Sequence, residues 1–254
     1  MRTPVVIVGI GEMAGVFGRA FLRTGRPVYP VTRDTDAASL ASEMPGPELV
    51  LIAVAEADLH DALSSLPAPW RHRVGLLQNE LTPPDWQMHH LEDPTVIAVW
   101  FEKKRGTGVK VIQPSPVAGP AAEMVVTSLE AIGIPAREIS RDRLPEELAA
   151  KNLYILVANL AGLDTGGTVG ELWSKHRDLA MAVASDVLGV QEALVGAELP
   201  RLALTDSLAT AIAADPDHGA TGRSAPARLR RTLDRAQEMG VAVPTLEDLA
   251  KRHL

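Results

Sequence analysis

A lysine and an asparagine share one apolar segment in the second half of the chain. Lys151 and Asn159 are eight residues apart in a helix expected to span Glu146–Leu160. With 3.6 residues per turn, their side chains lie on overlapping faces, about 12 Å apart along the axis. A lysine ammonium can protonate a carbonyl oxygen while a hydride reaches the carbon, so Lys151 is a candidate general acid. A solvated lysine and a structurally paired asparagine are the alternative.

A glycine-rich turn follows the first predicted strand. It reads Gly9-Ile10-Gly11-Glu12-Met13-Ala14, which is G-x-G-x-x-A. Gly9 permits a tight turn, Gly11 lets a pyrophosphate approach the backbone, and Ala14 allows the next helix to pack closely on the strand. Because strand, turn and helix follow in the required order, we predict a dinucleotide-binding turn. A purely structural turn is the alternative.

The end of the second predicted strand indicates which dinucleotide is bound. Thr32 and Arg33 stand where an NAD-binding protein usually has an acid for the ribose 2′-hydroxyl. A guanidinium can bind a 2′-phosphate through two parallel hydrogen bonds. We therefore predict NADP(H), with Thr32 and Arg33 among the cofactor-binding residues. Asp34 follows immediately, and a solvated loop arginine is the alternative.

Two further polar segments are candidates. Asn79 ends the fourth predicted strand, at the carboxyl edge where open α/β sheets bind ligands, and could contact cofactor or substrate. A turn asparagine is the alternative. The loop 215–224 could hold a carboxylate, with His218 as a candidate proton donor, although a flexible loop commonly has this composition. The pair His89-His90 lacks metal-site spacing, so we predict no metal.

The elements that position these side chains alternate between strand and helix in the first half. Continuous apolar strands suit a parallel sheet covered on both faces. Pro30 is expected at the end of an interior strand or beside a bulge, because it lacks a ladder donor. The predicted strands are Pro4–Val8, Val28–Thr32, Leu49–Val54, Val74–Gln78, Thr95–Phe101, Val109–Ile112 and Ala136–Ile139, and the predicted helices are Met13–Arg23, Ala37–Glu43, Ala57–Leu66 and Gly119–Ala131.

From about residue 142 the pattern is helical, and no strand is predicted after residue 140. Asp164–Gly167 ends the first helix, and Thr168 with Glu171 has capping-box spacing at the start of a long helix, Glu171–Val195. Further helices are predicted over Leu202–Ala213, Ala227–Glu238 and Leu246–Lys251. We therefore predict an α/β protein with a Rossmann-like dinucleotide-binding domain over 1–141 and an all-α domain over 142–254.

Composition excludes several other classes. The 254 residues carry a net charge of −7, which argues against nucleic acid as a partner. The absence of cysteine excludes disulfides, thiolate metal sites and a thiol nucleophile. The initial apolar run is too short for a signal segment, and Leu153–Leu163, interrupted by Asn159, is too short to cross a bilayer. We expect a cytoplasmic protein that acts on a small molecule, without a membrane partner.

Together the separated motifs resemble the ketopantoate reductase family, whose members reduce 2-dehydropantoate with NADPH. The resemblance covers most of the chain. It implies that Lys151 is the general acid and that Asn79 and Asn159 orient substrate or cofactor. The matching segments are Val8–Gly11 with Arg33, Leu77–Asn79, Lys151–Leu160, Thr168–Leu172 and Gly240–Thr245.

Four positions depart from the family pattern. Ala55 stands where the family has a lysine, Ile155 where it has an asparagine, and Ser224 where it has a late acidic residue. Glu80 replaces the glycine of the Q-N-G segment. Ser224 is still a candidate substrate-binding residue, because it occupies the position of the family's late acidic residue. The departures fit either a changed specificity or a lost activity.

These observations predict an NADPH-dependent reductase of a small 2-oxo acid. An NADP(H)-binding protein without catalytic activity, with a sensor or regulatory role, is the alternative. Hydride chemistry on a β-hydroxy acid or an imine is a third possibility, because one fold serves several chemistries. An apolar stripe along the helix Glu171–Val195 points to a homodimer, with intramolecular packing as an equal competitor. The stripe comprises Leu179, Val183, Val187 and Val190.

Overall fold

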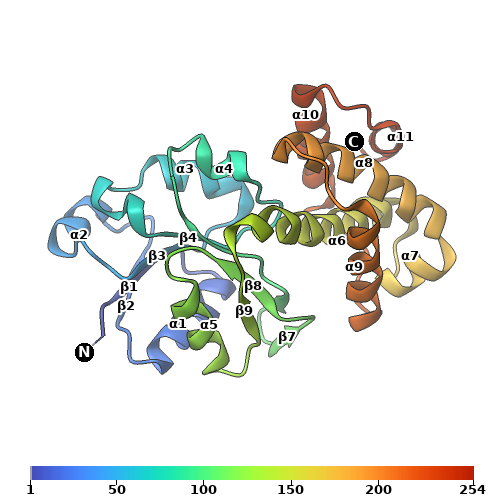
Figure 1. The fold of residues 1–254 in the computed structure, drawn as a ribbon. Coiled ribbons are helices and arrows are strands. Elements are labelled where there is room, and N and C mark those ends of the chain that lie inside the picture. The colour runs from blue at the N-terminus through green and yellow to red at the C-terminus, as the bar shows by residue number, and fades with distance from the viewer. Residues whose placement is uncertain (1) are drawn as a thin grey trace. The chain divides into compact units, whose positions relative to one another are not determined.

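The computed structural model describes residues 2–254 and divides the chain into two compact units, Met1–Leu144 and Pro145–Leu254 (Figure 1). The first unit is built on a seven-stranded sheet of order β2-β1-β3-β4-β5-β8-β9, in which β5 and β8 are antiparallel and all other neighbours are parallel. Its strands are β1 (Val5–Val8), β2 (Val28–Val31), β3 (Leu49–Ile52), β4 (Val74–Leu76), β5 (Thr95–Ile97), β8 (Ser115–Ala118) and β9 (Ala136–Glu138).

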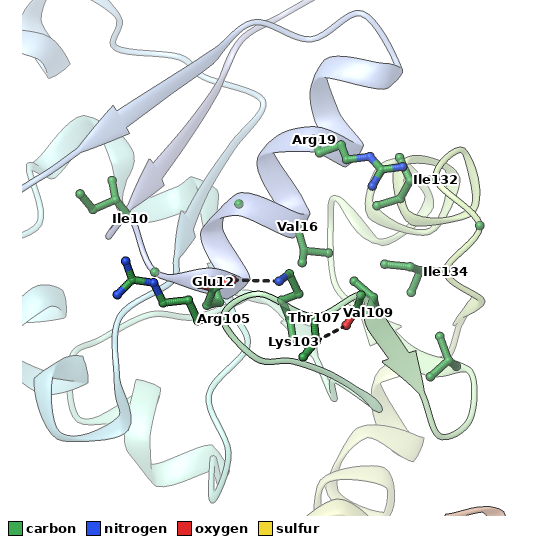
Figure 2. A pocket seen from close by; sticks show the side chains of 15 residues that line it. Ile10, Glu12, Val16, Arg19, Lys103, Arg105, Thr107, Val109, Ile132 and Ile134 are labelled. Atoms are coloured by element: carbon green, nitrogen blue, oxygen red, sulfur yellow. Dashed lines mark hydrogen bonds and ion pairs between the residues drawn. The ribbon is translucent and has the colours of Figure 1, made fainter.

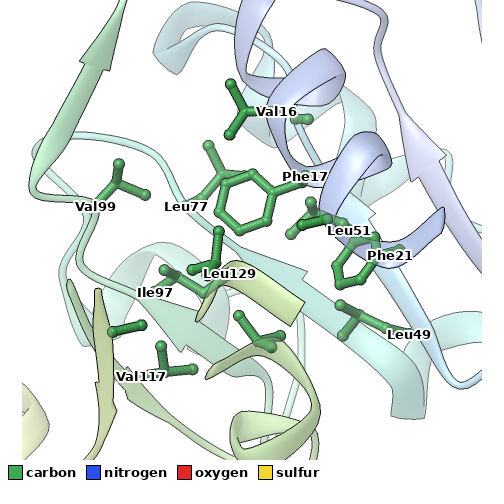
Figure 3. Close-up of a cluster of buried hydrophobic side chains, with 14 of the residues drawn as sticks. Val16, Phe17, Phe21, Leu49, Leu51, Leu77, Ile97, Val99, Val117 and Leu129 are labelled. Atoms are coloured by element: carbon green, nitrogen blue, oxygen red, sulfur yellow. The ribbon is translucent and has the colours of Figure 1, made fainter. Parts of the chain in front are cut away.

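Helices cover both faces of this sheet. On one face α1 (Glu12–Arg23) packs beside α5 (Ala122–Glu130), and α2 (Ala37–Glu43), α3 (Leu59–Ser64) and α4 (Pro83–Gln87) lie on the other (Figure 1). Phe17 and Phe21 lie one turn apart on the same face of α1, are fully buried and point toward Leu49 and Leu51 of β3 (Figure 3). Burying each aromatic ring stabilises this layer by about 2–3 kcal/mol, so the start of α1 is held firmly against the sheet.

Two strand predictions were wrong in detail. Pro30 lies within β2, but β2 is an edge strand, where a missing donor costs no ladder bond. The predicted strand Thr95–Phe101 is divided, because its last residue begins β6 (Phe101–Lys103), which pairs with β7 (Val109–Val111) in a separate hairpin. Residues 98–100 are buried without being in a strand, and so the apolar run gives no sign of the break.

The sequence analysis also missed β8. Pro116 lies within this strand, and a proline argues against a central strand because it removes a ladder donor. The segment nevertheless forms a strand between β5 and β9. The Pro116 carbonyl accepts a hydrogen bond from the Ala98 amide at 3.0 Å. The strand joins β9 to the rest of the sheet.

The second unit is helical throughout. Thr168 and Glu171 form the predicted capping box, with both reciprocal bonds at 3.2 Å. In α8 the buried Asp186 carboxylate accepts hydrogen bonds from the Thr245 and Leu246 amides, which caps α11 from a neighbouring helix. The helices are α6 (Leu144–Thr165), α7 (Val169–Lys175), α8 (Arg177–Val195), α9 (Arg201–Ala214), α10 (Ala225–Met239) and α11 (Pro244–His253).

The expected long helix Glu171–Val195 is two helices, α7 and α8, separated at His176. The apolar stripe on α8 is covered inside the helical unit, because α8 packs against α7, α10 and α11. Val183, Val187 and Val190 are at most 1 % exposed. Intramolecular packing therefore accounts for these three valines, whereas Leu179, the first residue of the stripe, is only half-buried. Within residues 2–254 no helix combines the length and apolar character needed to cross a bilayer.

Candidate functional site

The order of the strands in the sheet changes direction at β1, because β2 and β3 lie on opposite sides of it. The chain passes from β1 to the edge strand β2 and then crosses to β3 on the other side of β1. Ligands of open α/β sheets bind in the crevice at such a switch point, outside the carboxyl ends of the strands. Gly9 ends β1 there with φ of +98°, and a Cβ on it would lie 2.7 Å from the Ala53 carbonyl oxygen after β3. Glycine at position 9 is therefore required by the close approach of two strand ends.

Gly11 has a different role from Gly9. It precedes the first residue of α1 with an ordinary φ of −72°. A Cβ at Gly11 would meet no protein atom within 4 Å. Packing therefore does not require glycine here, and the missing side chain leaves open space before the amides of the helix. Ala14, one turn later, is buried against the sheet beneath α1. This geometry fits the predicted approach of a phosphate to the turn.

A cavity of about 1020 Å³ opens beside the glycine-rich turn, toward β2. Thr32 and Arg33 both line it, and the Thr32 hydroxyl lies 3.1 Å from that of Thr35, which organises the turn after β2. Arg33 is exposed and, within residues 2–254, forms no ion pair or hydrogen bond. Ala55 also lines this cavity and contributes no charge.

The same cavity carries three carboxylates. Asp34, Asp58 and Asp61 are among its lining residues, and Arg33 is the one cationic side chain among the described residues that line it. The charged side chains that line this cavity are therefore three carboxylates and one guanidinium.

A second cavity, of about 740 Å³, lies on the other side of the turn (Figure 2). It shares Ile10 and Gly11 with the first cavity. The start of α1, the β6–β7 hairpin and the turn before β9 form its walls. Sequence analysis gave no sign of it, because the hairpin and the turn are far from the glycines in sequence.

Asn79 follows β4 at the same edge of the sheet. Its amide nitrogen donates to Glu56 Oε1 at 3.0 Å, after β3. The neighbouring Gln78, which sequence analysis did not select, donates to the Ile52 carbonyl at 2.7 Å and so ties the ends of β3 and β4 together. Glu80 is buried and has φ of +62°, a conformation that favours glycine. A glycine would adopt this backbone conformation without strain.

Lys151 lies on α6 in the helical unit and is 6 % exposed. Its ammonium lies 5.9 Å from the ring centroid of Tyr154, within the range of a cation–π contact. The Tyr154 ring in turn lies 6.3 Å from that of His218, whose Nδ1 is 3.6 Å from Asp215 Oδ2. The lysine thus belongs to a connected group of aromatic and titratable side chains on α6 and the loop 215–224.

Asn159, also on α6, is buried and has a partner, as its position in an apolar helix requires. The Arg228 guanidinium of α10 donates to Asn159 Oδ1 at 2.8 Å. Because a guanidinium only donates, this bond fixes the orientation of the amide and leaves the Nδ2 group as the donor. The sequence gave no signal for Arg228, which lies 69 residues away on a largely polar helix.

Backbone hydrogen bonds connect the first part of the loop 215–224 to the segment between α6 and α7 and to the start of α7. The amides of Val169 and Gly170 donate to the carbonyls of His218 and Pro216 at 2.8 and 2.9 Å, and Ala220 donates to Gly167. A Cβ on Gly162 of α6 would collide with the Ala220 carbonyl. Residues 216–220 are therefore held against α6 and α7. Ser224 is exposed at the start of α10, and its side chain makes no capping bond.

A histidine pair lies elsewhere on the first unit. His60 Nδ1 and His89 Nε2 are 3.0 Å apart, and the two rings stack at 5.2 Å. Partial burial, and then the nearby His60 and Arg71 charges, lower the pKa of His89. The separation of 29 residues concealed this pair in the sequence.

Comparison with solved structures shows the fold. The chain is similar to 2-dehydropantoate 2-reductase from Methylococcus capsulatus, with a TM-score of 0.72, 14 % identity and coverage of 98 % of this chain and 95 % of the other. It is also similar to D-mandelate dehydrogenase in complex with NADH, with a TM-score of 0.67 and 13 % identity, over 98 % of this chain and 97 % of the other. For the dimeric ketopantoate reductase from Staphylococcus aureus, the TM-score is 0.67 and the identity 14 %, over 98 % of this chain and 96 % of the other.

No protein-family model and no curated protein sequence matches the chain. The likeness to solved structures therefore establishes the predicted architecture, a Rossmann-like sheet domain followed by a helical domain, over nearly the whole length.

The two glycines of the turn are expected to respond differently to alanine. Gly11→Ala should change the free energy of unfolding by less than about 1 kcal/mol and weaken NADPH binding at least about tenfold, since the methyl group occupies the phosphate space. Gly9→Ala should destabilise the fold by more than about 2 kcal/mol through backbone strain and collision with Ala53. Urea unfolding and fluorescence titration measure the two effects. Wild-type affinity in Gly11→Ala would contradict this assignment.

Proposed function

We propose that this protein is an NADPH-dependent reductase of a small 2-oxo acid. The observation that carries the proposal is Gly11, whose open space faces both cavities at the switch point although no packing requires a glycine. The fold supports it further, because the similar structures named above include reductases of a 2-oxo acid and a dehydrogenase of a 2-hydroxy acid. These are two directions of one hydride-transfer reaction.

The proposed site uses donors from the helical unit. The bound dinucleotide would supply the hydride, and Lys151 would donate the proton to the ketone oxygen. The Asn159 amide, oriented by Arg228, would donate to a carbonyl or carboxylate oxygen of the substrate. Asn79 and Ser224 complete the proposed set of cofactor- and substrate-binding side chains. Every one of these groups donates hydrogen bonds, as recognition of an oxo acid requires.

For the cofactor we propose NADP(H), with the 2′-phosphate at Arg33. The guanidinium lines the cavity beside the turn and forms no internal ion pair within the described chain, so it is available to a phosphate. We also propose a homodimer, in line with the dimeric neighbour, through a surface other than the buried valines of α8.

A non-catalytic NADP(H)-binding protein is the second candidate. The observation that favours it is Ala55, which contributes a methyl group to the cavity wall where the family has a lysine. The two candidates differ in one measurable respect, since the non-catalytic protein binds NADPH but oxidises it with no 2-oxo acid.

Lys151→Ala should lower kcat at least about a hundredfold, because the developing alkoxide loses its proton donor. NADPH affinity should change less than about twofold. The assay follows NADPH oxidation with ketopantoate and a panel of other 2-oxo acids. Lys175→Ala, at an exposed position of α7, is the matched control and should leave turnover unchanged. Wild-type turnover in Lys151→Ala would exclude this lysine as the acid.

Arg33→Gln should raise the Kd for NADPH at least about tenfold and leave the Kd for NADH within about twofold. The physical reason is that only NADPH carries the 2′-phosphate and no other cation among the described residues lines this cavity. Arg2→Gln, at an exposed position before β1, serves as a charge-matched control. Equal effects on both nucleotides would contradict a 2′-phosphate site at Arg33.

Asn159→Asp should raise the KM for the 2-oxo acid about tenfold or more without a comparable loss of stability. The carboxylate keeps an acceptor for Arg228 but loses the amide donor and repels an anionic substrate. Asn152→Asp makes the same change on the same helix, where the amide instead contacts Gln191, and should leave KM unchanged. An unaltered KM in Asn159→Asp would show that Asn159 is only structural. Steady-state kinetics and thermal unfolding separate the two roles.

A further inference from the structure

The tip of the β6–β7 hairpin carries three consecutive cations with different partners. Lys103 pairs with Glu12 at 3.2 Å, and Lys104 pairs with Glu102 at the same distance. Arg105 is exposed and forms no ion pair or hydrogen bond with any residue of 2–254. Two of the three cations are therefore paired with carboxylates of the protein, and Arg105 has no such partner among the described residues.

Two contacts set the position of this hairpin on α1. The ring of Phe101 packs against that of Phe17, with centroids 6.0 Å apart, and Glu12, the partner of Lys103, is the first residue of α1. An isolated two-stranded hairpin is marginally stable by itself. These contacts therefore anchor the hairpin at the glycine-rich turn and bring its tip close to that turn.

The second cavity lies between the hairpin and α1. Arg105 stands at one end of it, beside Ile10 and Glu12, and Arg19 stands at the other end, near Ile132 (Figure 2). Val16, Val109 and Ile134 supply apolar side chains between the two ends. Because Ile10 and Gly11 also line the first cavity, a ligand seated at the turn borders both cavities.

We propose that Arg105 binds the diphosphate of the dinucleotide and so completes its site from outside the βαβ unit. The inference rests on the proposed function, which places a dinucleotide at the turn. The diphosphate is the part of that ligand that lies over the glycines. A guanidinium binds phosphate oxygens through parallel charge-assisted hydrogen bonds, and this one has no competing carboxylate partner.

Arg105 and Arg33 then serve different phosphates. Of the two cavities described, Arg33 lines the one toward β2 and Arg105 lines the one toward the hairpin. The first would recognise the 2′-phosphate and select NADPH over NADH. The second would contribute equally to both nucleotides, because both contain the diphosphate.

The test is a set of Kd measurements on the full-length wild-type protein and three variants, Arg105→Gln, Arg33→Gln and Arg19→Gln. The probes are NADPH, NADH and adenosine 2′-monophosphate, which carries the 2′-phosphate without the diphosphate. Fluorescence titration follows the reduced nucleotides, and calorimetry follows the monophosphate. Arg105→Gln should weaken NADPH and NADH each about tenfold and leave the monophosphate unchanged. Arg33→Gln should weaken NADPH and the monophosphate and leave NADH unchanged.

Arg19→Gln is the matched control, since it removes the same charge from the far end of the same cavity. It should change no Kd by more than about twofold. An equal loss in Arg19→Gln and Arg105→Gln would overturn the proposal, because a general electrostatic field would then explain both. Unchanged affinities in Arg105→Gln would also overturn it while leaving the proposed function intact. Failure of the wild-type protein to bind either reduced nucleotide would overturn the proposed function itself.

Discussion

The close approach of two strand ends at Gly9 is the constraint on which the site depends. The chain leaves β1 at this residue with a positive φ, and the Ala53 carbonyl occupies the space that a side chain would need. This approach is a direct consequence of the crossover from β2 to β3 past β1. It brings the start of α1 and the segments after β2, β3 and β4 to one edge of the sheet. The cavities open at this edge because the strand order creates it.

In the helical unit, the positions of the polar side chains depend on residues that are distant in sequence. Asn159 and Lys151 lie on one apolar helix, and the partner that orients Asn159 comes from a distant segment. Arg228 reaches Asn159 from α10, while residues 216–220 are held against α6 and α7. A buried amide is expensive to leave unpaired, so the Asn159–Arg228 bond serves the fold as well as the proposed chemistry. Here the position of a polar side chain is set by long-range packing.

The local features of the first unit were predictable because their causes are local. Strand, glycine turn and helix follow one another within Val5–Arg23, and the capping box at Thr168 spans only four residues. The order of the strands depends on long-range pairing, so the edge position of Pro30 and the antiparallel β8 were missed. Likewise, Arg105 and Arg228 are unremarkable cations in sequence. Only the folded chain brings one to the glycine turn and the other to Asn159.

The proposed function depends on the binding of a phosphorylated dinucleotide at the open turn around Gly11. Titration of the purified wild-type protein with NADPH and, separately, NADH tests it most directly, with nucleotide fluorescence as the signal. We expect saturable binding of NADPH with an affinity at least about tenfold higher than for NADH. Binding of neither nucleotide at millimolar concentration would contradict it and would leave the glycine-rich turn with a purely structural role.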